Sequence, residues 1–174
     1  MAGPHSGALG AAHILIRILR AFNLVTGVML IVAIPASFLF EAQFFEFFSK
    51  RPPRIDSAWL LPALRLWMVL ALAMVAAIHV LLARLLAMVD TVRAGDPFVV
   101  DNAVRLQTIA WCALVLQLLH LAFGVMAATV NAAGSNVDWK FSGFTGWLAV
   151  LLLFVLARVF EEGTQMREDL QRMI

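Results

Sequence analysis

Two histidines, His79 and His120, lie inside long apolar segments, where an ionisable side chain is a functional candidate by default. His79 is five residues from Arg84, and His120 is fifteen residues beyond Arg105. At about 1.5 Å per helical residue, the two imidazoles differ in depth by about 15 Å, so they cannot share a metal ion or exchange a proton directly. Gln117 adds hydrogen-bonding capacity, but the apolar segments contain no acidic residue, which a proton or cation path normally needs. We interpret these three residues as interhelical hydrogen-bond partners, with a transport route as the alternative.

The chain carries no catalytic or cofactor-binding motif. H-E-x-x-H, C-x-x-C and G-x-S-x-G are missing, as is a phosphate-binding glycine loop. The single cysteine, Cys112, rules out an internal disulfide. The formal net charge is only +2 and no basic patch forms, which argues against direct binding of nucleic acid. We therefore expect a protein that is not an enzyme and needs neither a metal ion nor a cofactor.

The composition is that of a membrane protein. Hydrophobic residues make up 63% of the 174 residues and charged residues 14%, with a mean hydropathy of +0.91. Soluble domains average about 45–50% and about 25%. Four apolar runs, residues 21–40, 66–82, 106–130 and 143–159, are long enough to cross a bilayer core of about 30 Å as helices. The sequence predicts one all-α domain over residues 1–174, an integral membrane four-helix bundle, with residues 1–12 as a disordered N-terminus.

Basic residues favour one orientation of these spans. With the N-terminus in the cytoplasm, eight Lys and Arg residues fall on the cytoplasmic side and five on the outer side. Trp59, Trp67, Trp139 and Trp147 would then gather at the outer interface as an aromatic belt. We predict a multi-pass protein with both termini in the cytoplasm and with membrane lipids as its immediate partners.

Residues 41–50, between the first two spans, interleave phenylalanine with charged side chains. Such a segment suits the headgroup region of a bilayer. The alternative, which we favour, is a loop whose phenylalanines cover the helix ends.

Two of the predicted helices continue past the membrane into the cytoplasm with an apolar stripe at helical spacing. On the second helix the stripe consists of Leu82, Leu85, Val89 and Val92. On the fourth helix, whose tail would extend by about 20 Å, it consists of Val159, Gly163, Met166, Leu170 and Met173. We expect the stripes to pack against each other, with Phe98, Val99 and Val100 filling the join. The alternative is that a cytoplasmic protein covers them.

The turn between the second and third helices concentrates polar residues. Gly95 suits the left-handed conformation that ends a helix. Asp96 before Pro97 fits the N-cap of the next helix, and Asp101 is the competing N-cap. Asp101 also has the i, i+4 spacing needed to pair with Arg105.

These polar residues resemble a known family. The order Gly95-Asp-Pro-Phe98, Asn102, Arg105-Leu106 and Ile109-Ala-Trp111 is similar to a Gly-x-Pro-Phe…Asn-x-x-Arg-Leu…Ile-Gly-Trp signature. That signature belongs to the bacterial membrane family catalogued as domain of unknown function number twenty-nine seventy-five. The tail from Val159 to Asp169 resembles the family's closing Val-Phe-x-x-Gly…Arg-Glu-Asp motif. Two departures are Ala110, where glycine is usual and which would loosen helix packing slightly, and the different final residues 171–174.

The resemblance implies a four-helix protein of the bacterial inner membrane without assigned chemistry. Such proteins are often encoded beside small helix-turn-helix regulators, which suggests a membrane partner that restrains or tunes a DNA-binding protein. We therefore predict a non-catalytic scaffold or regulator with a cytoplasmic platform for a soluble regulatory protein. The platform consists of Gly95, Pro97, Phe98, Asp101, Asn102, Arg105, Phe160, Gly163, Arg167 and Glu168.

Two other functions remain open at this point. The first is a small transporter, channel or export-associated factor that uses His79, Gln117 and His120. The second is an accessory subunit of a larger membrane complex, docked through small-residue helix faces. A homo-oligomer is compatible with each reading.

Overall fold

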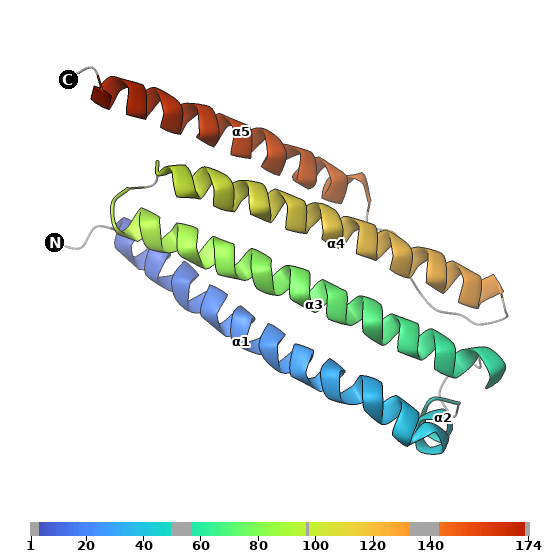
Figure 1. Cartoon of the computed structure of the whole chain (residues 1–174). Coiled ribbons are helices and arrows are strands. Elements are labelled where there is room, and N and C mark those ends of the chain that lie inside the picture. The colour runs from blue at the N-terminus through green and yellow to red at the C-terminus, as the bar shows by residue number, and fades with distance from the viewer. Residues whose placement is uncertain (1–3, 50–56, 97, 133–142, 173–174) are drawn as a thin grey trace.

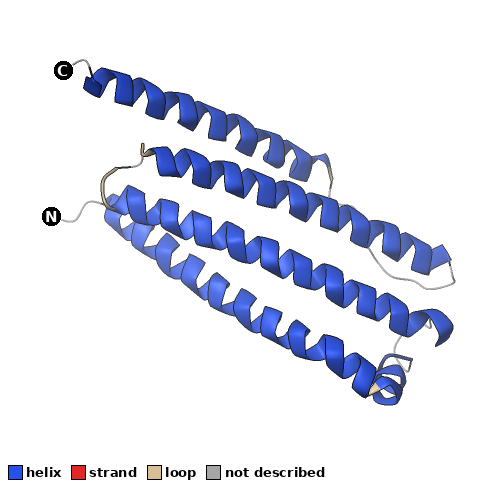
Figure 2. Cartoon of the chain, viewed as in Figure 1, coloured by secondary structure: helices blue, strands red, loops and turns tan. Residues whose placement is uncertain are grey.

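Helices make up most of the chain that the structure describes. This computed structural model describes residues 4–49, 57–96, 98–132 and 143–172. Within those ranges there are five helices and no strand (Figure 2). They are α1 (Pro4–Leu39), α2 (Glu41–Ser49), α3 (Ser57–Arg93), α4 (Val100–Ala132) and α5 (Phe144–Arg172). Four of them, α1, α3, α4 and α5, are long and apolar enough to cross a membrane, which confirms the predicted all-α architecture.

The first helix begins earlier than the sequence suggested. The prediction of disorder over residues 1–12 is wrong for residues 4–12, because α1 starts at Pro4. Proline suits the first position of a helix, and the alanines that follow favour helix formation. The start of α1 is also held by α3, since His13 Nε2 lies 3.3 Å from Asp90 Oδ1. Ile16 is buried one turn further on.

The four long helices form an open row. In Figure 1, α1 lies beside α3, α3 beside α4, and α4 beside α5. Among the described residues, α1 makes no packing contact with α4 or α5, and α5 packs on α4 alone. Only α3 and α4 therefore have helices on two sides. The outer faces of α1 and α5 carry many exposed apolar side chains, which suit a lipid environment.

Small side chains bring α4 and α5 together. Val150, Ala157 and Thr164 recur at seven-residue intervals on α5 and are all buried. On α4, Ala103, Ala110 and Gln117 have the same interval. Such a repeat keeps one seam of each helix facing its neighbour. Opposite Gln117, α5 has Gly146, where a Cβ atom would overlap the Gln117 amide.

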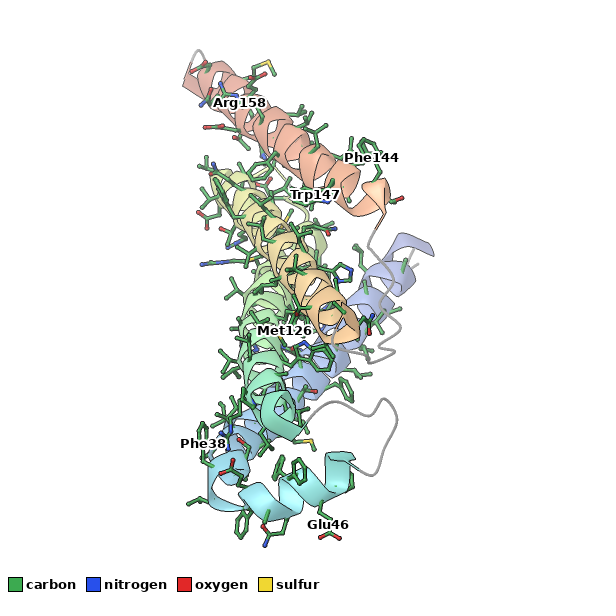
Figure 3. All side chains as sticks on the ribbon, turned by 90° about the vertical axis from the view of Figure 1, so that its right-hand side faces the viewer. Phe38, Glu46, Met126, Phe144, Trp147 and Arg158 are labelled. Carbon is green, nitrogen blue, oxygen red and sulfur yellow. The ribbon has the colours of Figure 1, made fainter. Side chains whose placement is uncertain are left out.

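The far end of the row is closed by α2, which is a helix rather than the loop we favoured. It lies across the end of α1 instead of alongside it (Figure 3). Arg65 of α3 holds this corner, because Nη2 donates to the Ser37 carbonyl at 2.9 Å and lies 3.5 Å from Glu41 Oε1. The Arg65 guanidinium also covers the Phe38 ring, 3.9 Å from the centroid.

Because Ala110 is buried, a substitution there tests how tightly α4 packs within the row. The relative exposure of Ala110 is 0%, so this side chain lies within tight packing. Ala110→Leu should destabilise the protein by about 1–3 kcal/mol, because an overfilled contact forces neighbouring helices apart. Thermal unfolding in detergent would measure the loss. Ala128→Leu, at an exposed position of the same helix, is the control and should change little; equal effects of the two variants would contradict the packing described.

Candidate functional site

The start of α1, the turn between α3 and α4, and the end of α5 lie at one end of the row, called here the loop end (Figure 1). The turn begins as predicted. Gly95 has φ +90°, and its N–H donates to the Val92 carbonyl at 3.1 Å. The Asp96 N–H donates to the Thr91 carbonyl at 3.2 Å. This pair of bonds is the Schellman arrangement that ends a helix with a left-handed glycine.

The start of α4 differs from both predicted N-caps. The helix begins at Val100, and Asp96 faces α5 instead. Asp101 lies inside the first turn of α4, where a carboxylate favours the positive end of the helix dipole. Its predicted contact with Arg105 is confirmed, at 3.3 Å from Nη2 to Oδ2. Pro97 lies outside the described residues.

Asn102 locks α4 onto α3 just after this turn. Its side chain is 1% exposed, and Nδ2 donates to Thr91 Oγ1 at 2.7 Å. Its Oδ1 accepts from Arg105 Nη1 at 2.9 Å, and the same nitrogen lies 3.4 Å from the Ala87 carbonyl oxygen. A buried amide with partners on both sides fixes the register of two helices. Asn102 therefore supports the platform from within and is not available to a partner.

The turn is joined to α5 by three contacts. Arg167 Nη1 forms an ion pair with Asp96 Oδ1 and donates to the Phe98 carbonyl at 3.0 Å. The Phe98 and Phe160 rings stack with their centroids 5.5 Å apart. Phe98, Phe160 and Arg167, which were predicted for the platform, thus meet, although Phe98 and Arg167 are 69 residues apart in sequence. Asp96, which was predicted only as an N-cap, joins them through its ion pair with Arg167.

The way in which α5 docks was predicted wrongly. The stripes of the second and fourth predicted helices do not pack together, since α3 and α5 make no packing contact among the described residues. Val159 and Met166 are 58% and 63% exposed. At Gly163, a Cβ atom would meet nothing within 4 Å. The side chains of Glu168, Leu170 and Met173 lie outside the described residues.

The ion pair changes the acidity of Asp96. A hydrogen bond from Arg167 lowers the pKa of the Asp96 carboxyl from its usual value, against a smaller opposing effect of burial. The charge of Arg167 and the Phe98 backbone lower that pKa further. The pKa of Arg167 is raised by the same hydrogen bond. The contact is therefore made between two charged groups at neutral pH.

Sequence reasoning missed a groove between α4 and α5 at the loop end. Its volume is about 250 Å³, and both helices contribute to its walls. The apolar lining comes from Val100, Ala103, Val104 and Ala157, and the polar lining from Gln107, Glu161, Thr164 and Gln165. No periodicity in one helix could have revealed it, because it arises where the small residues Ala103 and Ala157 face each other.

The intramembrane polar residues are dispersed. His79 Nε2 lies 3.5 Å from Arg20 Nη2 of α1, and Gln117 lies over Gly146 of α5. His120 is half-buried on α4. Across the described ranges, no group of three or more His, Cys, Asp or Glu side chains is placed to hold a metal ion.

The comparisons with known proteins agree with this architecture. A family model described as "Protein of unknown function (DUF2975)" matches residues 45–174. The chain belongs to this family. The match takes in α3, α4, α5 and part of α2, and therefore the whole set of contacts between Asp96, Phe98, Phe160 and Arg167. No curated protein and no solved structure matches the chain.

The lowered pKa gives a test of the turn's contact with α5. A carboxyl whose pKa falls on folding contributes stability above its unfolded pKa of about 3.9, and loses it as the pH falls through the lowered value. Arg167→Gln should move the Asp96 pKa back towards its usual value, as followed by the carboxyl ¹³C shift in detergent micelles. Arg158→Gln, which removes an arginine paired with Glu161 and Glu162, should leave it unchanged. An unaltered Asp96 pKa in Arg167→Gln would contradict the ion pair.

Proposed function

We propose that the protein is a non-catalytic scaffold or regulator of the bacterial inner membrane that holds a soluble cytoplasmic protein at its loop end. The observation that carries the proposal is the set of apolar side chains exposed on that end. They are Val92, Phe98, Val100 and Val104. In lipid such exposure is ordinary, but in water a contiguous apolar surface marks a site of interaction.

A set of arginines supports an aqueous setting for these side chains. Arg105 reaches the Ala87 carbonyl and so lies near the level of Arg84 on α3. Val104 and Ala157 line one groove, which brings Arg158 of α5 to a similar level. Arginines aligned on three adjacent helices suit the interface of a bilayer, where their guanidinium groups reach water. The turn and the end of α5 then lie beyond the lipid, on the cytoplasmic side by the distribution of basic residues.

The helix lengths fit this placement. α3 has 37 residues and would be about 55 Å long, against a bilayer core of about 30 Å. About twenty residues of α3 suffice for the core, so the rest of the helix extends beyond it. The contacts of Asn102 and Arg167 give that extension a defined shape, and a preformed surface loses less entropy when it binds a partner.

The groove between α4 and α5 is the part of the surface best suited to a protein partner. Its Val100 and Val104 walls offer an apolar contact, while Gln107, Glu161 and Gln165 offer hydrogen bonds at the rim. An apolar centre with a polar rim is typical of protein interfaces. By the resemblance described above, a small helix-turn-helix regulator is the partner that we propose.

A photo-crosslinking residue at position 104 tests this function in intact cells. Val104 is 58% exposed at the groove, whereas Asn102 is too deeply buried to report on a partner. The expected adduct is a soluble protein with a helix-turn-helix domain, identified by mass spectrometry. Gln165→Trp should reduce the yield several-fold, because the indole would fill the groove.

Position 125 provides the control for this experiment. Val125 is on the same helix and 59% exposed, but lies far along α4 from the loop end. A probe there should capture lipid and no soluble protein. Adducts at position 104 that contain only lipid or further copies of the chain would overturn the proposed function.

A further inference from the structure

The face of α5 turned away from α4 carries an apolar stripe. Ala157 and Thr164 are buried on the side towards α4. On the opposite side, exposed apolar side chains recur at steps of three, four or seven residues: Leu148, Leu152, Val155, Val159 and Met166. Lipid can cover Leu148, Leu152 and Val155. Val159 and Met166 lie at and beyond the level of Arg158, so lipid cannot cover the whole stripe.

We propose that a second copy of this chain covers the stripe, with the two α5 helices parallel and related by a two-fold axis along the membrane normal. A partner that follows the stripe out of the bilayer must itself cross the membrane. Every other copy inserted in the same direction presents the same stripe at the same depth. An isologous pair of α5 helices therefore covers both surfaces at once. α5 stands at the edge of the row, with no other described helix in the way (Figure 3).

Gly163 is the first local sign of such a contact. Glycine weakens a helix relative to alanine, so a helical glycine usually serves a close approach. Within one chain Gly163 serves none, because a Cβ atom there would meet nothing within 4 Å. Gly146 on the same helix is different, since it makes room for the Gln117 amide. Gly163 interrupts the stripe between Val159 and Met166, where a second helix would come closest.

The charges beside Gly163 match a parallel pair of helices. If Gly163 and Met166 are seam positions, Glu162 and Arg167 are the flanking positions that meet across a parallel coiled coil. The acid of one copy then faces the base of the other, and the symmetry gives this pair twice. Both side chains can take part. Arg167 uses Nη1 for both of its contacts with the turn and is 44% exposed. Glu162 accepts from Arg158 Nε through Oε1 at 3.1 Å and is 58% exposed, so a second arginine can still reach its carboxylate.

The pairing leaves the groove accessible. Glu161 and Gln165 line the groove and lie on another side of α5 from Val159 and Met166. The dimer would therefore present two grooves related by the same axis. The inference does not depend on the identity of any soluble partner.

Cysteine crosslinking in native membranes tests the pairing in a full-length Cys112→Ala background. Val159→Cys and Met166→Cys should each form a disulfide-linked species of about twice the 19.1 kDa mass of the chain. Gln165→Cys is the matched control, because Gln165 is the exposed neighbour of Met166 but faces the groove. It should give no dimer under the same oxidation.

Substitution of the two glycines separates pairing from folding. Gly163→Leu should lower the yield of the Met166→Cys dimer by about tenfold, without changing the thermal unfolding of the protomer in detergent. Gly146→Leu should lower that unfolding temperature, because leucine would displace Gln117. The proposal is overturned by similar dimer yields at positions 159, 165 and 166, by no dimer at any of them, by a disulfide to a different protein, or by a dimer that Gly163→Leu leaves intact.

Discussion

The docking of Arg167 onto the turn after α3 determines which surfaces this protein presents. The ion pair with Asp96 connects residues 71 positions apart, and the stacked rings of Phe98 and Phe160 lie beside it. α5 packs on α4 alone among the described helices, through the buried Val150, Ala157 and Thr164 and the edge-to-face rings of Trp111 and Phe154. The contacts at the loop end add to this seam. Together they fix which side chains of α5 line the groove and which face outward.

Exposed apolar side chains have different surroundings along this open row of helices. Along the membrane-spanning part, exposed leucine and valine meet lipid and need no further explanation. Past the level of Arg84, Arg105 and Arg158, we propose that a partner covers the same residue types. Asn102 and Gly95 shape the turn without being part of that exposed surface, since one is buried and the other ends α3. Within the predicted platform, residues such as Asn102 and Gly95 therefore shape the surface, whereas other residues are exposed on it.

Much of the fold could be predicted from sequence, for reasons that are local. The four spans follow from hydropathy, the left-handed turn follows from Gly95, and the contact between Asp101 and Arg105 follows from helical spacing. The N-cap of α4 could not be predicted, because Asp96 has a distant partner in Arg167. The packing face of α5 was predicted wrongly because large apolar residues were expected to face a neighbour. Between membrane helices the small residues often do so, here Ala157 and Thr164, while Val159 and Met166 face outward.

The most direct measurement is oxidation of a double variant, Phe98→Cys with Phe160→Cys, in sealed membrane vesicles with Cys112 replaced by alanine. The stacked rings place these positions next to each other. The account predicts an intramolecular disulfide that protects both thiols from a membrane-impermeant maleimide, and it predicts that, before oxidation, both thiols react from the same side of the membrane. Thiols that are labelled from opposite sides, or that remain reduced under conditions where exposed cysteine pairs oxidise, would contradict it.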